Sequence, residues 1–264
     1  MSDNREPTLA VRCGKLNLIR RLVKPPRASL RDLWLTLLVA LLWGLLVHAR
    51  PWVIHTRCAN HPSVCAADTV PKLDHYALDH DSPMADGLSY DTQNFSGVWA
   101  YAIPIGLQIG RVALQSQPLG LALSLIAQDS LILTETIVLN GALNESARLL
   151  VQRPRPFVYH DVGYYGSDPQ NYTSFYSGHT SFAAATNGAL IFTLLGRTRS
   201  LTLLAVVAVL GPLLILLTGL FRILSGRHFL TDVLTGAAAG ILVSLAVALA
   251  HRASHRASAE KEHA

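Results

Sequence analysis

Six long stretches of mostly apolar residues constrain this chain more than any other feature of its sequence. Each approaches or exceeds the roughly 17 residues that a helix needs to cross about 30 Å of hydrocarbon. Charged residues make up only 15% of the chain, against about 25% in soluble domains. Because lipid offers no partner for open backbone groups, we predict an all-α, polytopic membrane bundle of six transmembrane helices. A soluble bundle of buried helices is the alternative, and six such runs argue against it. The runs cover about residues 33–49, 95–115, 119–143, 180–196, 200–221 and 231–250.

The distribution of positive charge predicts how this bundle is oriented. Residues 1–31 carry eight Lys and Arg, and the connections and tail expected on the same side bring that number to fourteen, against eight on the other side. The positive-inside rule then places both termini in the cytoplasm. We therefore expect a basic cytoplasmic arm over 1–31, a membrane domain over 32–250 and a disordered cytoplasmic tail over 251–264. The net charge of +5 follows from topology, so it does not indicate a nucleic-acid partner.

Two outer loops are expected, over residues 50–94 and 148–178. The first contains Cys58 and Cys65. On the outer side of a membrane two cysteines can form a disulfide or stay as free thiols, and the sequence leaves both alternatives open. The same loop holds Asp74-His75 and Asp79-His80, but their spacing is not that of metal ligands, so we favour a solvated loop and no metal site. Cys13 lies on the inner side and is expected to be an ordinary thiol.

Asp129 and Glu135 are acidic residues inside an expected span, where a charge is costly. They are expected to face the bundle and find partners there. The alternative is a polar path or a contact with a substrate headgroup.

Three short motifs lie where an apolar stretch meets a loop, and all three fall on the predicted outer side. They combine three arginines, two histidines and one carboxylate. Arginine offers a planar fork of donors that matches phosphate oxygens, and a histidine four residues before an aspartate shares its helix face. Each motif alone is more often structural, as a core histidine or a headgroup anchor. The motifs are Arg148-x6-Arg155-Pro156, Ser177-Gly178-His179 and Arg222-x5-His228-x3-Asp232.

Together these residue types suit phosphoryl chemistry. Asp232 is expected to accept a hydrogen bond from one nitrogen of His228, which leaves the other nitrogen free as a nucleophile. His179 is a candidate acid for the leaving group. Gly178 permits a close backbone approach to a phosphate oxygen, and Ser177 can donate from its hydroxyl.

With these motifs in order, the chain resembles the type 2 phosphatidic acid phosphatase superfamily over roughly residues 95–250. The family pattern is Lys-x6-Arg-Pro, Pro-Ser-Gly-His and Ser-Arg-x5-His-x3-Asp. This chain departs from it at Arg148, Tyr176 and Phe221, which replace lysine, proline and serine. Arg148 keeps the positive charge, with a fork of donors in place of a point charge, and neither Tyr176 nor Phe221 is expected to do chemistry.

The resemblance implies a metal-independent lipid phosphatase that needs no cofactor. Phosphate would lie among Arg148, Arg155 and Arg222, with His228 as nucleophile and His179 as acid and then base. The implied substrates come from the outer leaflet of a bacterial-type inner membrane: undecaprenyl diphosphate, phosphatidylglycerol phosphate, phosphatidic acid or lipid A. A lipid phosphotransferase, a vanadate-dependent haloperoxidase and a non-catalytic lipid-phosphate binder are the alternatives, and the expected spans argue against the haloperoxidase because those enzymes are typically soluble.

Overall fold

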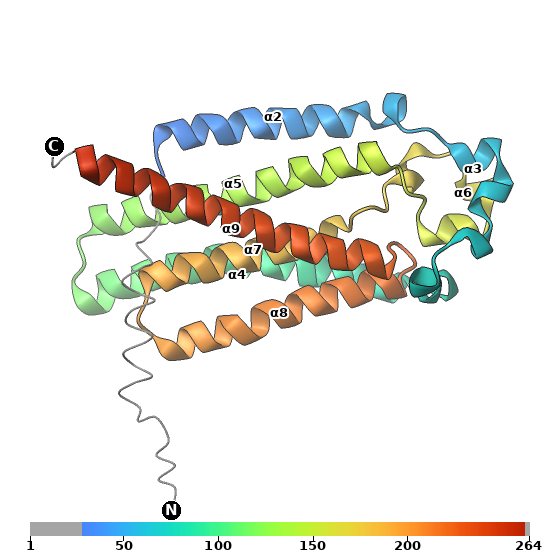
Figure 1. Cartoon of the computed structure of the whole chain (residues 1–264). Helices are drawn as coiled ribbons and strands as arrows, with labels where there is room; N and C mark the ends of the chain where they lie inside the picture. Colours follow the sequence, from blue (N-terminus) through green and yellow to red (C-terminus); the bar gives the residue numbers. More distant parts are fainter. Residues whose placement is uncertain (1–27, 262–264) are drawn as a thin grey trace, which may run out of the picture.

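Six long helices run side by side and form the body of the molecule (Figure 1). The computed structural model describes residues 28–261, with side chains as far as Arg252; most of the basic arm, including Cys13, lies outside the described residues. Over the described range there is no β-strand, as an all-α fold requires. The long helices are α2 (Leu30–Val53), α4 (Pro83–Gln115), α5 (Leu119–Val151), α7 (Gly178–Arg197), α8 (Leu201–Leu224) and α9 (Leu230–Lys261).

Serine caps begin four of these helices. Ser29 forms a capping box with Asp32 at the start of α2. The hydroxyls of Ser82, Ser177 and Ser200 accept hydrogen bonds from backbone amides in the first turns of α4, α7 and α8. Each cap satisfies an amide that the helix itself leaves without a partner, so the sequence fixes where these helices begin.

Helix α7 occupies the centre of the bundle and contacts α4, α5, α8 and α9. Its middle is built from Ala183, Ala184 and Ala185, which are fully buried. Small residues on α9 match them, because a β-carbon added at Gly240 would lie 2.3 Å from the backbone oxygen of Ser181. Close approach of backbones through small residues is typical of helix packing in membranes.

The outer surface of the bundle is rich in exposed leucine, which is expected where a helix faces lipid. Five helical segments, containing α2, α4, α5, α8 and α9, are long and apolar enough to cross a membrane, and they make this chain an integral membrane protein. Helix α7 is long enough but is not among them. Its threonines, serine and asparagine lower its hydropathy, and the four helices around it bury these side chains.

The helices extend further than the sequence indicated. Helix α4 begins at Pro83 instead of residue 95, and α2 runs to Val53, so the first connection spans 54–82 and not 50–94. The second connection spans 152–177, because α5 continues to Val151. The backbone of α9 is helical as far as Lys261, where a disordered tail from 251 was expected. At the start of α4 the polar residues do not interrupt the helix, since Asp86 and Ser89 both accept hydrogen bonds from Arg222.

Asp129 and Glu135 both have partners within the bundle. Asp129 on α5 accepts hydrogen bonds from Arg197 at the end of α7, the shortest at 2.7 Å. Glu135 lies 2.7 Å from the Nε2 atom of His251 on α9. These contacts agree with the bundle-facing interpretation of the two acidic residues.

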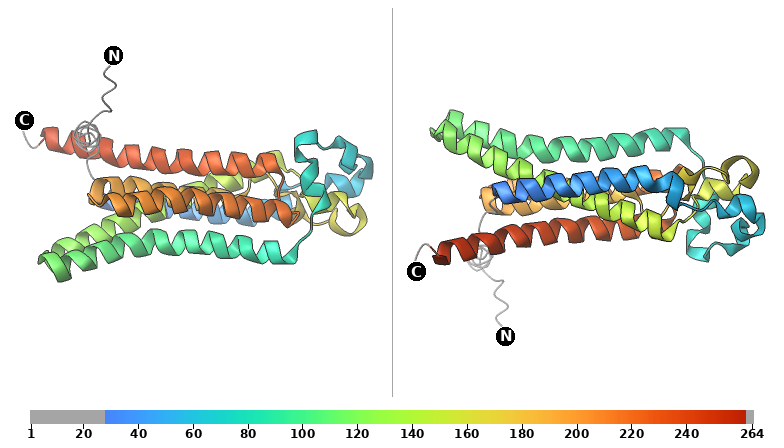
Figure 2. Two further views of the ribbon diagram at one scale, coloured as in Figure 1. Left: turned by 90° about the horizontal axis from the view of Figure 1, so that it is seen from below. Right: turned by 90° about the horizontal axis from the view of Figure 1, so that it is seen from above.

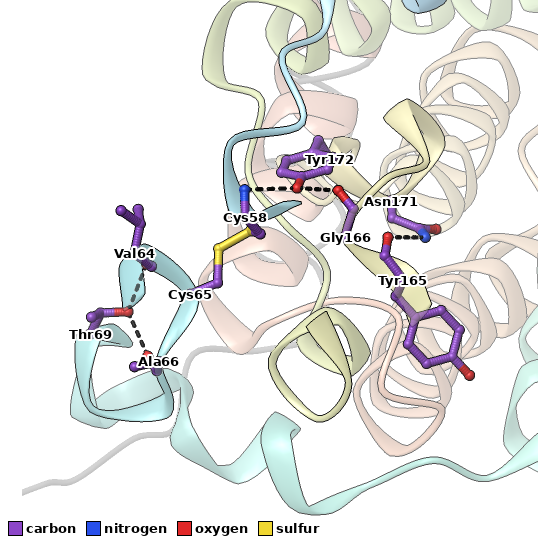
Figure 3. The surroundings of a disulfide bond; sticks show 9 residues. All are labelled: Cys58, Val64, Cys65, Ala66, Thr69, Tyr165, Gly166, Asn171 and Tyr172. Carbon is purple, nitrogen blue, oxygen red and sulfur yellow. Dashed lines mark hydrogen bonds between the residues drawn. A yellow bond between two sulfur atoms is a disulfide. The ribbon is translucent and has the colours of Figure 1, made fainter. Parts of the chain in front are cut away.

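The two long connections meet at one end of the bundle, where they form a cap of short helices (Figure 2). Within this cap Cys58 and Cys65 form a disulfide (Figure 3). The Tyr172 hydroxyl joins the two connections, since it accepts from the Cys58 amide at 3.0 Å and donates to the Gly166 carbonyl at 2.6 Å. The short elements are α3 (Arg57–Asn60), η1 (Pro62–Cys65), η2 (Ala67–Thr69), η3 (Lys72–Asp79), η4 (Pro156–Tyr159), α6 (Val162–Tyr165) and η5 (Pro169–Tyr172).

Candidate active site

The three sequence motifs converge beneath this cap, at the end of the bundle where α5 and α8 finish and α7 and α9 begin (Figure 1). Arg148 lies in the last turn of α5, and Arg222 lies in the last turn of α8. His179 is in the first turn of α7, and His228 lies two residues before the start of α9. The antiparallel order of the helices therefore brings together residues that are up to 80 positions apart.

His228 is fully buried, and its ring orientation is fixed by the backbone. Its Nδ1 atom lies 2.7 Å from the carbonyl oxygen of Ser174. Because a carbonyl only accepts, Nδ1 carries the proton and Nε2 keeps its lone pair. The Nε2 atom has no hydrogen-bond partner among the described residues.

The surroundings of His228 favour its neutral form. Burial lowers the pKa of His228 well below its usual value, and the positive charges of Arg222, Arg155 and Arg148 lower it further. A neutral imidazole with a free lone pair is the form that acts as a nucleophile. The three arginines that the sequence assigned to phosphate binding thus all lower the pKa of His228.

Asp232 does not accept the predicted hydrogen bond from His228. Its nearer oxygen is 3.9 Å from Nδ1, beyond hydrogen-bond distance. Asp232 instead accepts from the Ser174 hydroxyl at 2.6 Å and from the Phe229 amide at 3.0 Å. The aspartate therefore holds Ser174, and the Ser174 carbonyl in turn orients His228.

Asp74 also belongs to this network, which no motif in the sequence indicated. Asp74 comes from the first connection, is buried, and accepts from Arg153 at 2.7 Å and from the Thr231 amide at 2.9 Å. Burial alone would raise the pKa of Asp74, but the hydrogen bonds from Arg153 and Thr231 hold it below its usual value. Arg153 also donates to Asp232 at 2.7 Å, so one guanidinium joins two carboxylates. The side chain of Asp74 is turned to Arg153 rather than toward a set of metal ligands, and the described residues contain no group of three or more His, Cys, Asp and Glu placed to hold a metal ion.

Each phosphate-binding arginine of the sequence analysis is held in place by other side chains. Arg222 donates to Asp86 at 2.6 Å and to the Ser89 hydroxyl at 3.1 Å, both on the first turns of α4. Arg155 donates to the Thr173 hydroxyl at 3.1 Å.

Arg148 lies 3.5 Å from buried Glu145, which also forms a two-pronged ion pair with Arg50 of α2. The Nε atoms of Arg148, Arg155 and Arg222 are buried and without a hydrogen-bond partner among the described side chains.

The start of α7 is tightly constrained at Gly178. A β-carbon at this position would lie 2.6 Å from the Nη2 atom of Arg148 and 3.0 Å from the side-chain oxygen of Asn144, so a larger residue would have to displace the end of the Arg148 side chain. The Ser177 hydroxyl caps α7, where it lies 2.9 Å from the Thr180 hydroxyl. Ser177 therefore positions the helix start, and its donation to a phosphate oxygen stays a prediction.

His179 faces Tyr90 of α4, with ring centroids 4.4 Å apart in an edge-on arrangement. The same tyrosine ring lies 5.9 Å from the guanidinium carbon of Arg222. The Nε2 atom of His179 is buried and has no partner among the described residues. Tyr90 and Asp86 were not predicted, because they lie in a polar stretch that was expected to be loop.

The fold and the site together define a membrane-embedded helical protein with a buried histidine among three arginines. Residues 129–256 match the family model of the PAP2 superfamily, and through this region, which carries all three motifs, the chain belongs to that superfamily. The superfamily consists of phosphoesterases, so the chain has the fold and motifs of a phosphatase. No curated protein and no solved structure matches the chain.

Proposed function

We propose that this protein is a lipid phosphatase that hydrolyses a phosphomonoester or diphosphate bond through a phosphohistidine intermediate, without a metal ion. The observation that carries the proposal is the state of His228. Its protonated Nδ1 is held by the Ser174 carbonyl, and its unpartnered Nε2 lies in the positive field of three arginines. An attacking nitrogen and the charges that would stabilise a phosphoryl group are thus at one place.

The proposed reaction has two steps. Arg148, Arg155 and Arg222 hold the phosphoryl oxygens with the amide of Gly178, while His228 Nε2 attacks phosphorus. A nitrogen–phosphorus bond forms as the bond to the leaving oxygen breaks, and His179 gives that oxygen a proton. His179 then takes a proton from water, which attacks phosphorus and breaks the nitrogen–phosphorus bond to release inorganic phosphate. The guanidinium groups stabilise the negative charge that spreads over the equatorial oxygens.

The proposed topology has six spans, with α7 as the sixth. Both termini are then cytoplasmic, and the site faces the outer side of a bacterial-type inner membrane. Two observations support this orientation: fourteen of the Lys and Arg residues fall on the side of the termini, and the disulfide-bonded cap lies at the other end. The substrate would be a lipid phosphate of the outer leaflet, such as undecaprenyl diphosphate, phosphatidylglycerol phosphate, phosphatidic acid or lipid A.

Phosphate release in detergent with EDTA, over a panel of these lipids, tests the proposal. We expect release by the wild type and by His160→Ala, which removes an exposed histidine of the second connection. His228→Ala should lose activity by a factor of at least about 10² to 10³. Release that EDTA abolishes, or that His228→Ala retains, would contradict the mechanism. Transfer of phosphate only when a second lipid is added would assign the site to a phosphotransferase.

A further inference from the structure

A buried carboxylate connects helix α2 to the candidate active site. Glu145 of α5 lies between two arginines, Arg50 of α2 and Arg148 of its own helix. Arg50 is 95 residues away in the sequence and lies outside residues 129–256, which match the family model. Carboxylate and phosphate oxygens accept from the same guanidinium donors. The partner that Glu145 takes therefore matters for Arg148, one of the arginines assigned to phosphate.

The two arginines share Glu145 unequally. Arg50 donates to both carboxylate oxygens through Nε and Nη2, which is the bidentate geometry of a strong pair. The Nη1 atom of Arg148 is 3.5 Å from one of these oxygens, longer than the usual limit of about 3.2 Å. Gln170 of the second connection accepts from Arg50 Nη1 at 2.8 Å and so fixes the Arg50 guanidinium. Glu145 is thus held firmly by Arg50 and only loosely by Arg148.

The other end of the Arg148 guanidinium faces the start of α7. Its Nη2 atom would lie 2.6 Å from a β-carbon at Gly178, whose amide is among the proposed phosphate contacts. Within the part of the chain that the structure describes, Glu145 is the only hydrogen-bond partner of the Arg148 side chain. Because the charges of Arg50 and Glu145 cancel, the positive charge of Arg148 stays available at the start of α7.

We propose that Arg50 is a positioning residue, which binds Glu145 and so leaves Arg148 available to the substrate phosphate. Without Arg50, Glu145 would have Arg148 as its one remaining cation, and a buried carboxylate that lacks a partner is costly. The two would form a close pair, and phosphate would have to displace Glu145 from Arg148. Arg50 has this role only if Arg148 holds a phosphoryl oxygen, as in the proposed function.

Binding of inorganic phosphate to the full-length protein in detergent, followed by phosphorus NMR, tests this role without turnover. We expect Arg50→Gln to weaken phosphate binding about tenfold, as for the loss of one charge-assisted hydrogen bond. The double variant Arg50→Gln, Glu145→Gln should bind phosphate like the wild type, because no carboxylate then competes for Arg148. Arg57→Gln is the matched control, since it removes an exposed arginine of the first connection, and it should bind like the wild type.

The rescue separates this role from a structural one. If Arg50 only stabilised the fold, the double variant would bind phosphate as weakly as Arg50→Gln, and that result or unchanged affinity in Arg50→Gln would overturn the proposal. If Arg50→Gln does not fold, Glu145→Gln takes its place. It should bind phosphate at least as tightly as the wild type, and a tenfold loss would mean that Glu145 itself holds Arg148 in place. Wild-type binding that Arg148→Gln leaves unchanged would instead contradict the proposed phosphate site, so the two failures are distinguishable.

Discussion

At the scale of single residues, Ser174 connects the aspartate of the third motif to the histidine. Its hydroxyl donates to Asp232 at 2.6 Å, and its carbonyl holds His228 Nδ1 at 2.7 Å. Loss of the hydroxyl would loosen the carbonyl that fixes the ring. The four-residue spacing of His228 and Asp232 correctly placed them side by side, but the sequence contained no sign that a residue from another segment lies between them.

We expect Ser174→Ala to lower kcat about tenfold or more with little change in KM, since a hydrogen bond to a charged group contributes about 1.5 to 3 kcal/mol. Steady-state phosphate release measures both constants. Ser146→Ala is a suitable control, because within the described part of the chain the Ser146 hydroxyl bonds only to the backbone of its own helix. Wild-type kinetics for Ser174→Ala, combined with an inactive Asp232→Asn, would mean that the aspartate acts on the histidine directly.

The buried state of His228 also predicts how stability depends on pH. Its pKa in the folded protein is below the unfolded value of about 6.5, so between these two values the unfolded chain binds one more proton. The free energy of unfolding should therefore fall as the pH drops below about 6.5. His228→Asn removes this contribution, and its Tm should decrease less than that of the wild type between pH 7.5 and pH 5.5. If the wild type and His228→Asn lose Tm equally, the histidine is not buried in its neutral form.

At the scale of helices, α7 and α9 are in close contact. This contact determines how His179, at the start of α7, lies relative to His228 and Asp232, at the start of α9. Gly240→Ala would place a methyl group 2.3 Å from the Ser181 backbone oxygen, which has no room to move. We expect a loss of about 1 to 3 kcal/mol in the free energy of unfolding, the usual effect of overpacking. Gly44→Ala, where a β-carbon meets nothing within 4 Å, should retain or slightly raise stability. Thermal unfolding in one detergent compares the two variants, and equal Tm values would contradict the close contact.

The apolar stretches of the sequence predicted where the long helices lie. They did not show how far these helices extend into polar sequence. Residues 83–94 are polar and were expected to be loop, yet they form the first turns of α4 because Ser82 caps them and Asp86 and Ser89 bind Arg222. Hydropathy alone does not show such pairings. Asp74 and Arg153 are 79 residues apart, and neither belongs to a repeating pattern. The motifs thus identified the histidines and arginines, while the residues that hold them required the three-dimensional contacts.

At the scale of the whole molecule, the cap formed by the two connections contacts the residues that orient His228. The disulfide between Cys58 and Cys65 closes a loop within the first connection, and the Tyr172 hydroxyl of the second connection accepts a hydrogen bond from the Cys58 amide (Figure 3). The same connection carries Asp74, which reaches Arg153 and through it Asp232. The position of the cap therefore affects the network that orients His228, although no residue of the first connection belongs to the sequence motifs.

Asp74→Asn tests whether the cap contributes to catalysis. The substitution removes one of two carboxylates from Arg153, which is then free to draw Asp232 away from Ser174. We expect kcat to fall about tenfold or more, because hydrogen bonds to charged groups contribute about 1.5 to 3 kcal/mol. Asp68→Asn, at an exposed position of the same connection, should leave kcat unchanged. If Asp74→Asn lowers the Tm but leaves kcat of the folded fraction at the wild-type value, then Asp74 has a purely structural role. That result would mean that the cap does not contribute to catalysis.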